Sequence, residues 1–362
     1  MNRITDKCPE CMIYSMSNAA ECNEIMAFHQ EANGNLTFIK AYKTGGKGTG
    51  EQTVDPLMSQ GSIVLSDNNR FLFGVNAGSN SISSFKITNS GTLLPADVQH
   101  CGGFFPVSIA THRNLLYVVN RGDGSSIPSN ITGFWVDENG MLSEMKLATK
   151  PLSSKSAQPT CIVFNYESRK IAVSEVNTNL ISIFTIQQDG TLFGPVVNTS
   201  SGAGPFGSVF LTNKILLVSE AGANALSSYT VNHDGTLSVI SSSVPNFQMA
   251  TCWVSLSQNR RFAYTSNAGG HTITTYDIEF NGLLRVSNII YSTKDGTGAP
   301  IDNGVCSSYL FVLNGNEGSL SVFQTGPEDK LIRTQVFGDT CLPKTGSQGL
   351  VVLYPNPHYR NS

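Results

Sequence analysis

The sequence has 362 residues, of which 14% are charged and 34 are glycine, and its formal net charge is -3. Charged residues usually make up about a quarter of a soluble domain, so this composition argues against a helical or disordered chain. The near-neutral charge gives no reason to expect nucleic acid or anionic lipid as a partner. No apolar run reaches the ~18 residues of a spanning helix, so no membrane insertion is expected.

A tight turn followed by leucine recurs seven times, and the intervals between successive turns run from 45 to 57 residues. The turns are Asn33–Leu36, Ser90–Leu93, Asn139–Leu142, Asp189–Leu192, Asp234–Leu237, Asn281–Leu284 and, in degraded form, Asp329–Leu331. Asn-Gly and Asp-Gly pairs supply the positive φ of hairpin turns, and strand repeats of this length form propellers. The sequence therefore predicts an all-β, seven-bladed β-propeller with four antiparallel strands per blade.

Three strand patterns lie in a fixed order between these turns. In chain order the inner runs are 61–65, 107–110, 160–164, 207–211 and 251–255. The second runs are 70–75, 115–119, 170–174, 215–219, 262–266 and 309–313, and the third runs are 81–87, 180–184, 225–229, 272–276 and 319–323. Alternation with a period of two and enrichment in β-branched residues between glycine turns favour strands over helices.

The two ends of the chain are predicted to share one blade. Residues 11–42 supply a second, third and outer strand with no inner strand before them, and the missing inner strand matches Gly349–Leu353. Pairing these segments closes the ring and removes an exposed sheet edge. The whole chain, 1–362, is then one propeller domain, with residues 1–10 as a loose arm and 354–362 as a tail.

Long loops are expected at one end of the ring. Segments 43–60, 149–158, 292–303 and 338–348 each lead into an inner strand, and these loops share one face with the loops that leave the second strands. Long loops gathered on one face are typical of a lid over the channel mouth.

The cysteines and the N-terminus predict a cytoplasmic protein. The first seven residues lack the apolar core of a secretion signal, and the eight cysteines are expected to be free thiols. Cys8 and Cys11 form a CxxC pair, but no second pair lies at zinc-site spacing, so no metal is expected. No cofactor and no obligate protein partner are expected either; the expected partner is a small-molecule substrate.

The segment Ser201–Pro205, which precedes a strand ending in Val218-Ser219-Glu220, and the Asp-Gly-Thr-Leu turns resemble the lactonase-type propellers. That family includes 6-phosphogluconolactonase-like proteins and fungal carboxymuconate cyclases. Glu220 matches the acidic residue of the family. Its Arg-His pair and His-Pro-His triplet are replaced here by Phe206-Gly207 and Gln158-Pro159-Thr160.

The loss of these basic residues disfavours an anionic substrate. The residues at the starts of the inner strands, Val107, Thr160, Phe206 and Thr251, are mostly small or apolar and suit a neutral, hydrophobic compound. In overall character the chain also resembles the propeller proteins encoded in fungal trichothecene toxin gene clusters. That resemblance implies a sesquiterpenoid of secondary metabolism (a mycotoxin intermediate) as the ligand, and ring closure, as by the cyclase relatives, as the reaction.

Two carboxylates are the catalytic candidates. Glu175 and Glu220 each follow the Val-Ser end of a second strand in adjacent blades, and both are expected to point toward the channel mouth. In a partly apolar cavity one of them would stay protonated and act as a general acid on a leaving hydroxyl. The alternative is that they pair with a base or cap a turn.

Amides occupy the equivalent positions of other blades. Asn76, Asn120, Asn267 and Asn314 are predicted either to hydrogen-bond the following turn or to bind substrate hydroxyls. Two further residues complete the predicted substrate-binding set. Arg121 forms either an ion pair or a ligand contact, and His271 is a loop histidine, as is His100.

Three functions remain open from the sequence. The first is a cyclase- or lyase-like enzyme that closes a ring in a neutral oxygenated compound with acid assistance. The second is a lactonase. The third is a propeller that binds a small molecule or serves as a scaffold without catalysis.

Overall fold

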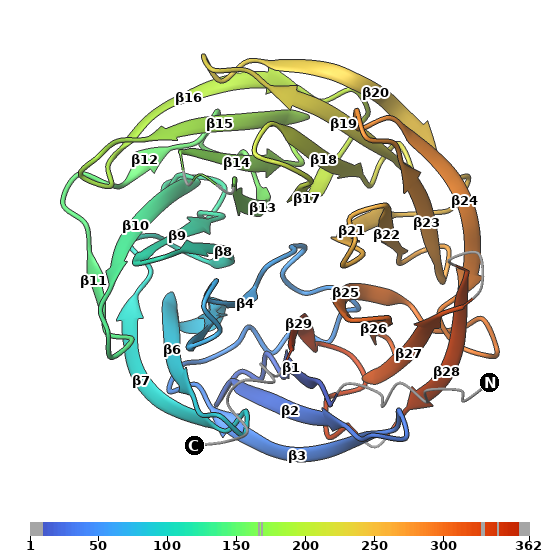
Figure 1. The fold of residues 1–362 in the computed structure, drawn as a ribbon. Helices are drawn as coiled ribbons and strands as arrows, with labels where there is room; N and C mark the ends of the chain where they lie inside the picture. Colours follow the sequence, from blue (N-terminus) through green and yellow to red (C-terminus); the bar gives the residue numbers. More distant parts are fainter. Residues whose placement is uncertain (1–9, 166, 168, 327–329, 339, 355–362) are drawn as a thin grey trace.

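Seven antiparallel sheets are arranged around a central axis, as the computed structural model shows (Figure 1). Six have four strands, and the seventh has five because its outer strand is split in two. The structure describes residues 10–165, 167, 169–326, 330–338 and 340–354. Residues 1–9 of the predicted arm, which include Cys8, therefore lie outside the described residues. So do residues 355–362 of the predicted tail, and Asp329. The predicted seven-bladed propeller is confirmed.

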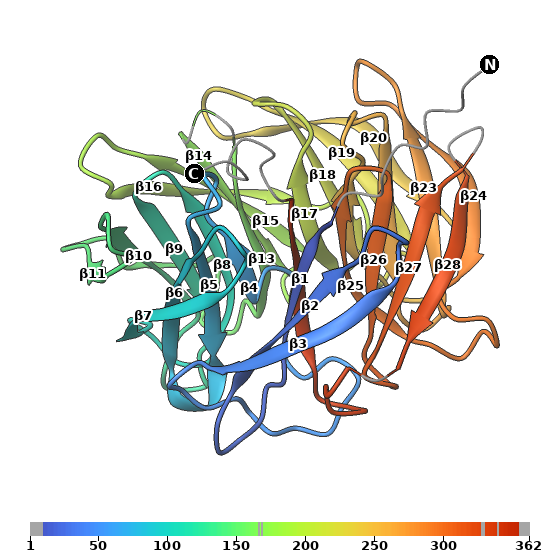
Figure 2. The same ribbon diagram turned by 60° about the horizontal axis from the view of Figure 1, so that its bottom comes forward.

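In each blade the strands are ordered from the channel outward (Figure 1), and Figure 2 shows the same ring turned toward its side. The inner strands are β4 (Ile63–Leu65), β8 (Pro106–His112), β13 (Pro159–Phe164), β17 (Pro205–Phe210), β21 (Thr251–Leu256), β25 (Pro300–Cys306) and β29 (Gln348–Leu353). The second strands are β5 (Phe71–Asn76), β9 (Leu115–Asn120), β14 (Lys170–Glu175), β18 (Ile215–Glu220), β22 (Phe262–Asn267), β26 (Tyr309–Asn314) and β1 (Met12–Met16).

The third strands are β6 (Ser81–Ile87), β10 (Asn130–Val136), β15 (Leu180–Ile186), β19 (Ala225–Val231), β23 (Thr272–Ile278), β27 (Ser319–Thr325) and β2 (Glu24–Gln30). The outer strands are β7 (Leu93–His100), β16 (Leu192–Thr199), β20 (Leu237–Pro245), β24 (Leu284–Tyr291), β28 (Leu331–Phe337) and β3 (Leu36–Lys43). In the remaining blade the outer strand is split into β11 (Leu142–Glu144) and β12 (Lys150–Pro151), and a short 3₁₀ helix, η1 (Ala77–Ser79), follows β5.

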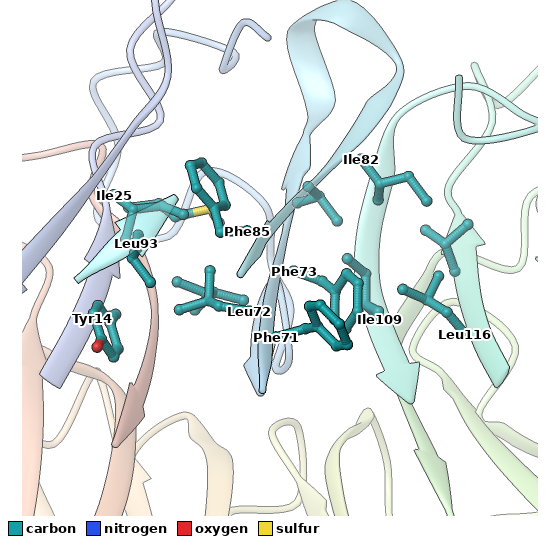
Figure 3. Close-up of a cluster of buried hydrophobic side chains, with 14 of the residues drawn as sticks. Tyr14, Ile25, Phe71, Leu72, Phe73, Ile82, Phe85, Leu93, Ile109 and Leu116 are labelled. Carbon is teal, nitrogen blue, oxygen red and sulfur yellow. The ribbon is translucent and has the colours of Figure 1, made fainter. Parts of the chain in front are cut away.

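The hydrophobic core lies between the blades. Successive residues of a strand point to opposite faces, so Leu72 of β5 faces Tyr14 while Phe73 faces Ile109 of the next blade (Figure 3). Leu72, Phe73 and Tyr14 are fully buried. Burying a side chain of this size contributes about 1.5–3 kcal/mol, so neighbouring blades stabilise one another.

The ring closes where the two ends of the chain meet. Strand β1 pairs antiparallel with β29, with Met12 opposite Leu353 and Ser15 opposite Leu350. The Ser15 hydroxyl also donates to the Gly349 carbonyl at 2.7 Å. The predicted shared blade is confirmed, and Figure 1 shows β29, β1, β2 and β3 as one sheet.

A disulfide joins this closing blade to its neighbour. Cys11, just before β1, is bonded to Cys306 at the end of β25, 295 residues away in sequence. The expectation of free thiols is wrong for this pair, because only ring closure brings the two residues together. Among the described residues Cys22, Cys101, Cys161, Cys252 and Cys341 are free.

Replacing Cys11 with serine should lower the free energy of unfolding by about 2–4 kcal/mol, since the disulfide restricts the unfolded chain. Denaturant unfolding under non-reducing conditions measures the loss. Cys341→Ser, at an exposed free cysteine, is the control and should leave stability unchanged. Equal stability of Cys11→Ser and wild type would show that the bond does not form in solution.

Candidate functional site

The loop between β3 and β4 fills the centre of the ring. Figure 1 shows this segment running into the middle of the propeller. We call residues 51–61 the channel loop. Leu57 and Ser59 are buried. The predicted lid over the mouth is, for this segment, an insertion into the channel itself.

Polar contacts fix the channel loop to five inner strands. The Ser59 carbonyl accepts from Trp253 Nε1 at 2.9 Å and from Gln348 Nε2 at 3.1 Å, and the Ser59 hydroxyl donates to the Val107 carbonyl at 2.8 Å. The backbone N–H of Gln60 donates to the Thr160 carbonyl at 2.9 Å. The Gln60 side chain donates to the Ser208 carbonyl at 3.0 Å and accepts from the Val254 N–H at 2.8 Å.

Three predicted substrate-binding residues are packed inside this region. Phe206 is buried edge-on against Trp253, with ring centroids 5.1 Å apart. The buried Thr160 hydroxyl donates to the Phe206 carbonyl at 3.0 Å. The Thr251 hydroxyl, also buried, donates to Asn267 Oδ1 at 2.8 Å. Their contacts support the walls of the ring, and ligand binding by them stays a prediction.

Glu175 is fully buried at the end of β14. Its Oε1 accepts from the Ser182 hydroxyl of β15 at 2.5 Å and from the Ser153 N–H at 3.3 Å. Its Oε2 accepts from the Ser153 hydroxyl and, at 3.1 Å, from the Thr178 hydroxyl. The carboxylate thus ties β14 to its own blade and to the loop that leaves the preceding blade.

Glu220 lies in the same way at the end of β18 and is also fully buried. Its Oε1 accepts from the Gly202 N–H at 2.8 Å and from the hydroxyls of Ser227 at 2.7 Å, Ser200 at 3.1 Å and Tyr229 at 3.3 Å. Its Oε2 has no hydrogen-bond partner. These contacts match the structural alternative left open above, and catalysis by either glutamate stays a prediction.

The four asparagines make equivalent contacts, and all are fully buried. The Nδ2 of Asn76 donates to the hydroxyls of Ser81 and Ser83, five and seven residues later. Asn267 repeats this with Thr272 and Thr274, and Asn314 with Ser319 and Ser321. Asn120 differs, since its Nδ2 donates to the Cys101 carbonyl and to Asn130 Oδ1. Hydrogen bonding of the following turn or strand therefore explains these residues without a ligand.

Glu220→Ala should destabilise the protein by roughly 2–4 kcal/mol, because buried donors lose their acceptor. Glu220→Gln keeps an oxygen acceptor and should cost less than about 1 kcal/mol. Chemical denaturation of both variants measures the two costs. If Glu220→Gln lowers stability as much as Glu220→Ala does, the charge of Glu220 is essential and a purely geometric role is wrong.

Two aspartates that sequence analysis did not single out lie at the channel. Asp302 in β25 is 5% exposed, and its oxygens accept from the N–H groups of Asn303 at 2.8 Å and Leu350 at 3.0 Å. Burial raises the pKa of Asp302 to about 8, and nearby Asp55 adds to the rise. Burial raises the pKa of Asp55, in the channel loop, to about 7 despite its contacts with Gln348, Met58 and Arg121.

These shifts give a pH dependence with a definite sign. An unfolded aspartate ionises near pH 4, whereas folded Asp302 keeps its proton until about pH 8. The carboxyl therefore stabilises the fold fully below pH ~4, and this contribution is lost as pH rises toward 8. Asp302→Asn should gain melting temperature relative to wild type as pH rises from about 5 to 9. A constant difference across that range would contradict the shifted pKa.

A cavity of about 390 Å³ opens at the channel mouth. Its walls are Phe104, Phe105, Arg121, Gly122, Asp123, Gly124, Ser156, Gln158 and Asn177. We call it the mouth cavity. The Arg121 guanidinium lies over the Phe105 ring, 4.6 Å from its centroid, and donates to the Leu57 carbonyl of the channel loop. The buried Nε of Arg121 has no hydrogen-bond partner.

The mouth cavity contains one member of the predicted site, Arg121. Glu175, Glu220, His271 and the four asparagines do not line it. Asn177, which sequence analysis missed, lies in the turn just after Glu175. Its position beside a candidate catalytic residue was the one feature of the sequence that could have pointed to it.

Among the described residues no group of three or more His, Cys, Asp or Glu side chains could hold a metal ion, and no helix is long and apolar enough to cross a membrane.

Comparisons with known proteins agree with this architecture. A family model described as "Lactonase, 7-bladed beta-propeller" matches residues 21–125, and no curated protein matches the sequence. The periplasmic gluconolactonase PpgL of Pseudomonas aeruginosa is 14% identical, with a TM-score of 0.74 over 96% of this chain and 100% of that one.

Two further solved structures are similar to the same extent. A proposed 6-phosphogluconolactonase from Bacteroides fragilis is 15% identical, with a TM-score of 0.74 over 98% of this chain and 100% of that one. A Lactobacillus plantarum protein is 15% identical, with a TM-score of 0.73 over 96% of this chain and 100% of that one. At these identities the structures establish a shared fold. Together with the family match they support the resemblance to lactonase-type propellers, and none supports the resemblance to trichothecene-cluster proteins.

Proposed function

We propose that the protein acts as a lactonase-type enzyme on a small, largely neutral cyclic ester that binds in the mouth cavity. The family match and the shared fold support this class of reaction. The observation that carries the proposal is the placement of Arg121 in the cavity wall, because a guanidinium can polarise an ester carbonyl and stabilise the oxyanion that forms from it.

The rest of the cavity sets the substrate class. Phe104 and Phe105 supply apolar walls, while Gln158 and Asn177 supply neutral amides. Arg121 is the single cationic residue among the described lining residues, and Asp123 offsets its charge. A phosphorylated or strongly anionic sugar lactone would meet little positive charge, so an uncharged lactone fits better.

A second reaction is compatible with the same cavity. Acid-assisted ring closure in a neutral oxygenated sesquiterpenoid, of the trichothecene type in fungal secondary metabolism, would form a ring C–O bond rather than hydrolyse one. The replacement of the lactonase-type Arg-His pair and His-Pro-His triplet by Phe206-Gly207 and Gln158-Pro159-Thr160 favours it. In this proposal the protein needs no cofactor and works without an obligate partner in the cytoplasm.

One experiment separates these reactions. Purified protein is incubated with neutral and sugar-acid lactones in a pH-stat, and with hydroxylated sesquiterpenoid precursors followed by mass spectrometry. We expect turnover of a neutral substrate, reduced roughly 10²-fold or more by Arg121→Met through loss of oxyanion stabilisation. Arg113→Met, which removes a cation outside the mouth cavity, is the control.

The outcomes distinguish three functions. Lactone hydrolysis supports the lactonase proposal, and conversion of a precursor with loss of water supports ring closure. Rates no faster than buffer for every compound would contradict catalysis, and ligand binding without turnover would then indicate the binding or scaffold function.

A further inference from the structure

The residue just before the inner strand has a positive φ in four successive blades. The angle is 59° at Phe105, 51° at Gln158, 71° at Gly204 and 56° at Ala250. In each blade the carbonyl of this residue accepts from the N–H of the residue that follows the second strand, at 2.7–3.2 Å. The same left-handed turn therefore leads into β8, β13, β17 and β21. Glycine adopts this conformation freely, whereas any other residue is strained there.

Of these four blades, the two with a large side chain at the turn are the two that border the mouth cavity. Phe105 and Gln158 line the cavity, whereas Gly204 and Ala250 do not. The fold itself explains Phe105, because its ring packs against two hydrophobic clusters of the core and contacts the Arg121 guanidinium. The strained residue that still needs an explanation is Gln158.

The side chain of Gln158 makes few contacts with the rest of the protein. It is half-buried, and its Nε2 donates to Met58 Sδ at 3.5 Å, although a thioether is a weak acceptor. Within the part of the chain that the structure describes, no group donates to Gln158 Oε1. A strained backbone that holds a nearly unpartnered amide in a cavity wall indicates a role in ligand binding.

We propose that Gln158 determines the specificity of the mouth cavity by binding a hydroxyl group of the ligand. This inference rests on the proposed function and narrows its substrate class to a neutral lactone that carries a hydroxyl group. The amide Oε1 accepts the hydroxyl proton or Nε2 donates to the hydroxyl oxygen, while Arg121 of the same wall binds the ester carbonyl. A hydroxylated precursor of the ring-closure reaction presents the same group to Gln158.

A matched pair of neutral lactones tests this assignment in the full-length protein. Mevalonolactone and β-methyl-δ-valerolactone differ by one ring hydroxyl. We expect the wild type to prefer mevalonolactone in kcat/KM, mainly through KM. Gln158→Leu keeps the size of the side chain but loses the hydrogen bond, and should reduce this preference roughly 3–10-fold. Gln158→Asn keeps the amide and tolerates a positive φ, so it should retain part of the preference.

Glycine at the same turn separates a role in binding from a role in folding. Gln158→Gly removes the amide and the backbone strain together, so it should lose the preference for mevalonolactone without a lower melting temperature. Ala250→Gly makes the matched change at the turn before β21, outside the cavity, and should keep both the activity and the preference of the wild type.

Each result decides between the two levels of the proposal. A wild type that hydrolyses both lactones equally well, or variants of Gln158 that keep the wild-type preference, overturns this inference and leaves the lactonase proposal intact. A lower melting temperature of Gln158→Gly with an unchanged preference shows that Gln158 is structural. A wild type that neither binds nor hydrolyses any neutral lactone overturns the lactonase proposal and this inference together.

Discussion

The channel loop is the constraint on which the ring depends. Inner strands that face an open channel must satisfy their polar backbone groups with water or with protein, and here one loop does so for several blades. Through Ser59 and Gln60 it contacts β8, β13, β17, β21 and β29. A displacement of this loop would therefore break contacts in five blades together.

The last residue of the second strand is a glutamate in two blades and an asparagine in four others, and both residue types hold the same local geometry. An amide both donates and accepts, so Asn76 Nδ2 donates to the Ser83 hydroxyl, which in turn donates to the Thr44 carbonyl. A carboxylate only accepts, so the matching hydroxyls of Ser182 and Ser227 donate to Glu175 and Glu220 instead. The geometry of the blade is kept while the direction of one hydrogen bond is reversed.

The sequence predicts the features that depend on local patterns and misses those that depend on contacts between distant residues. The blades and the shared closing blade depend on local turns and period-two strands, which a single sequence displays. The burial of Glu175 depends on Ser153, which comes from the preceding blade, and the Cys11–Cys306 bond spans 295 residues. The channel loop meets Trp253 across 194 residues. The spacing of residues along the chain does not reveal such contacts. The length of the segment before β4 therefore indicated a lid over the mouth, but not the insertion of the channel loop into the channel.

Because the channel loop occupies the channel, it also limits where a ligand site can lie. Side chains deep in the ring are packed around the channel loop, so the proposed function places the ligand at the mouth, between loops that differ from blade to blade. The fold shared with gluconolactonases does not by itself establish their chemistry, because function depends on the loops grafted onto the fold. In this chain the loops bring a cation and two phenylalanine rings to one place. The cation, Arg121, donates to the Leu57 carbonyl of the channel loop, so the element that holds the blades together also positions this guanidinium.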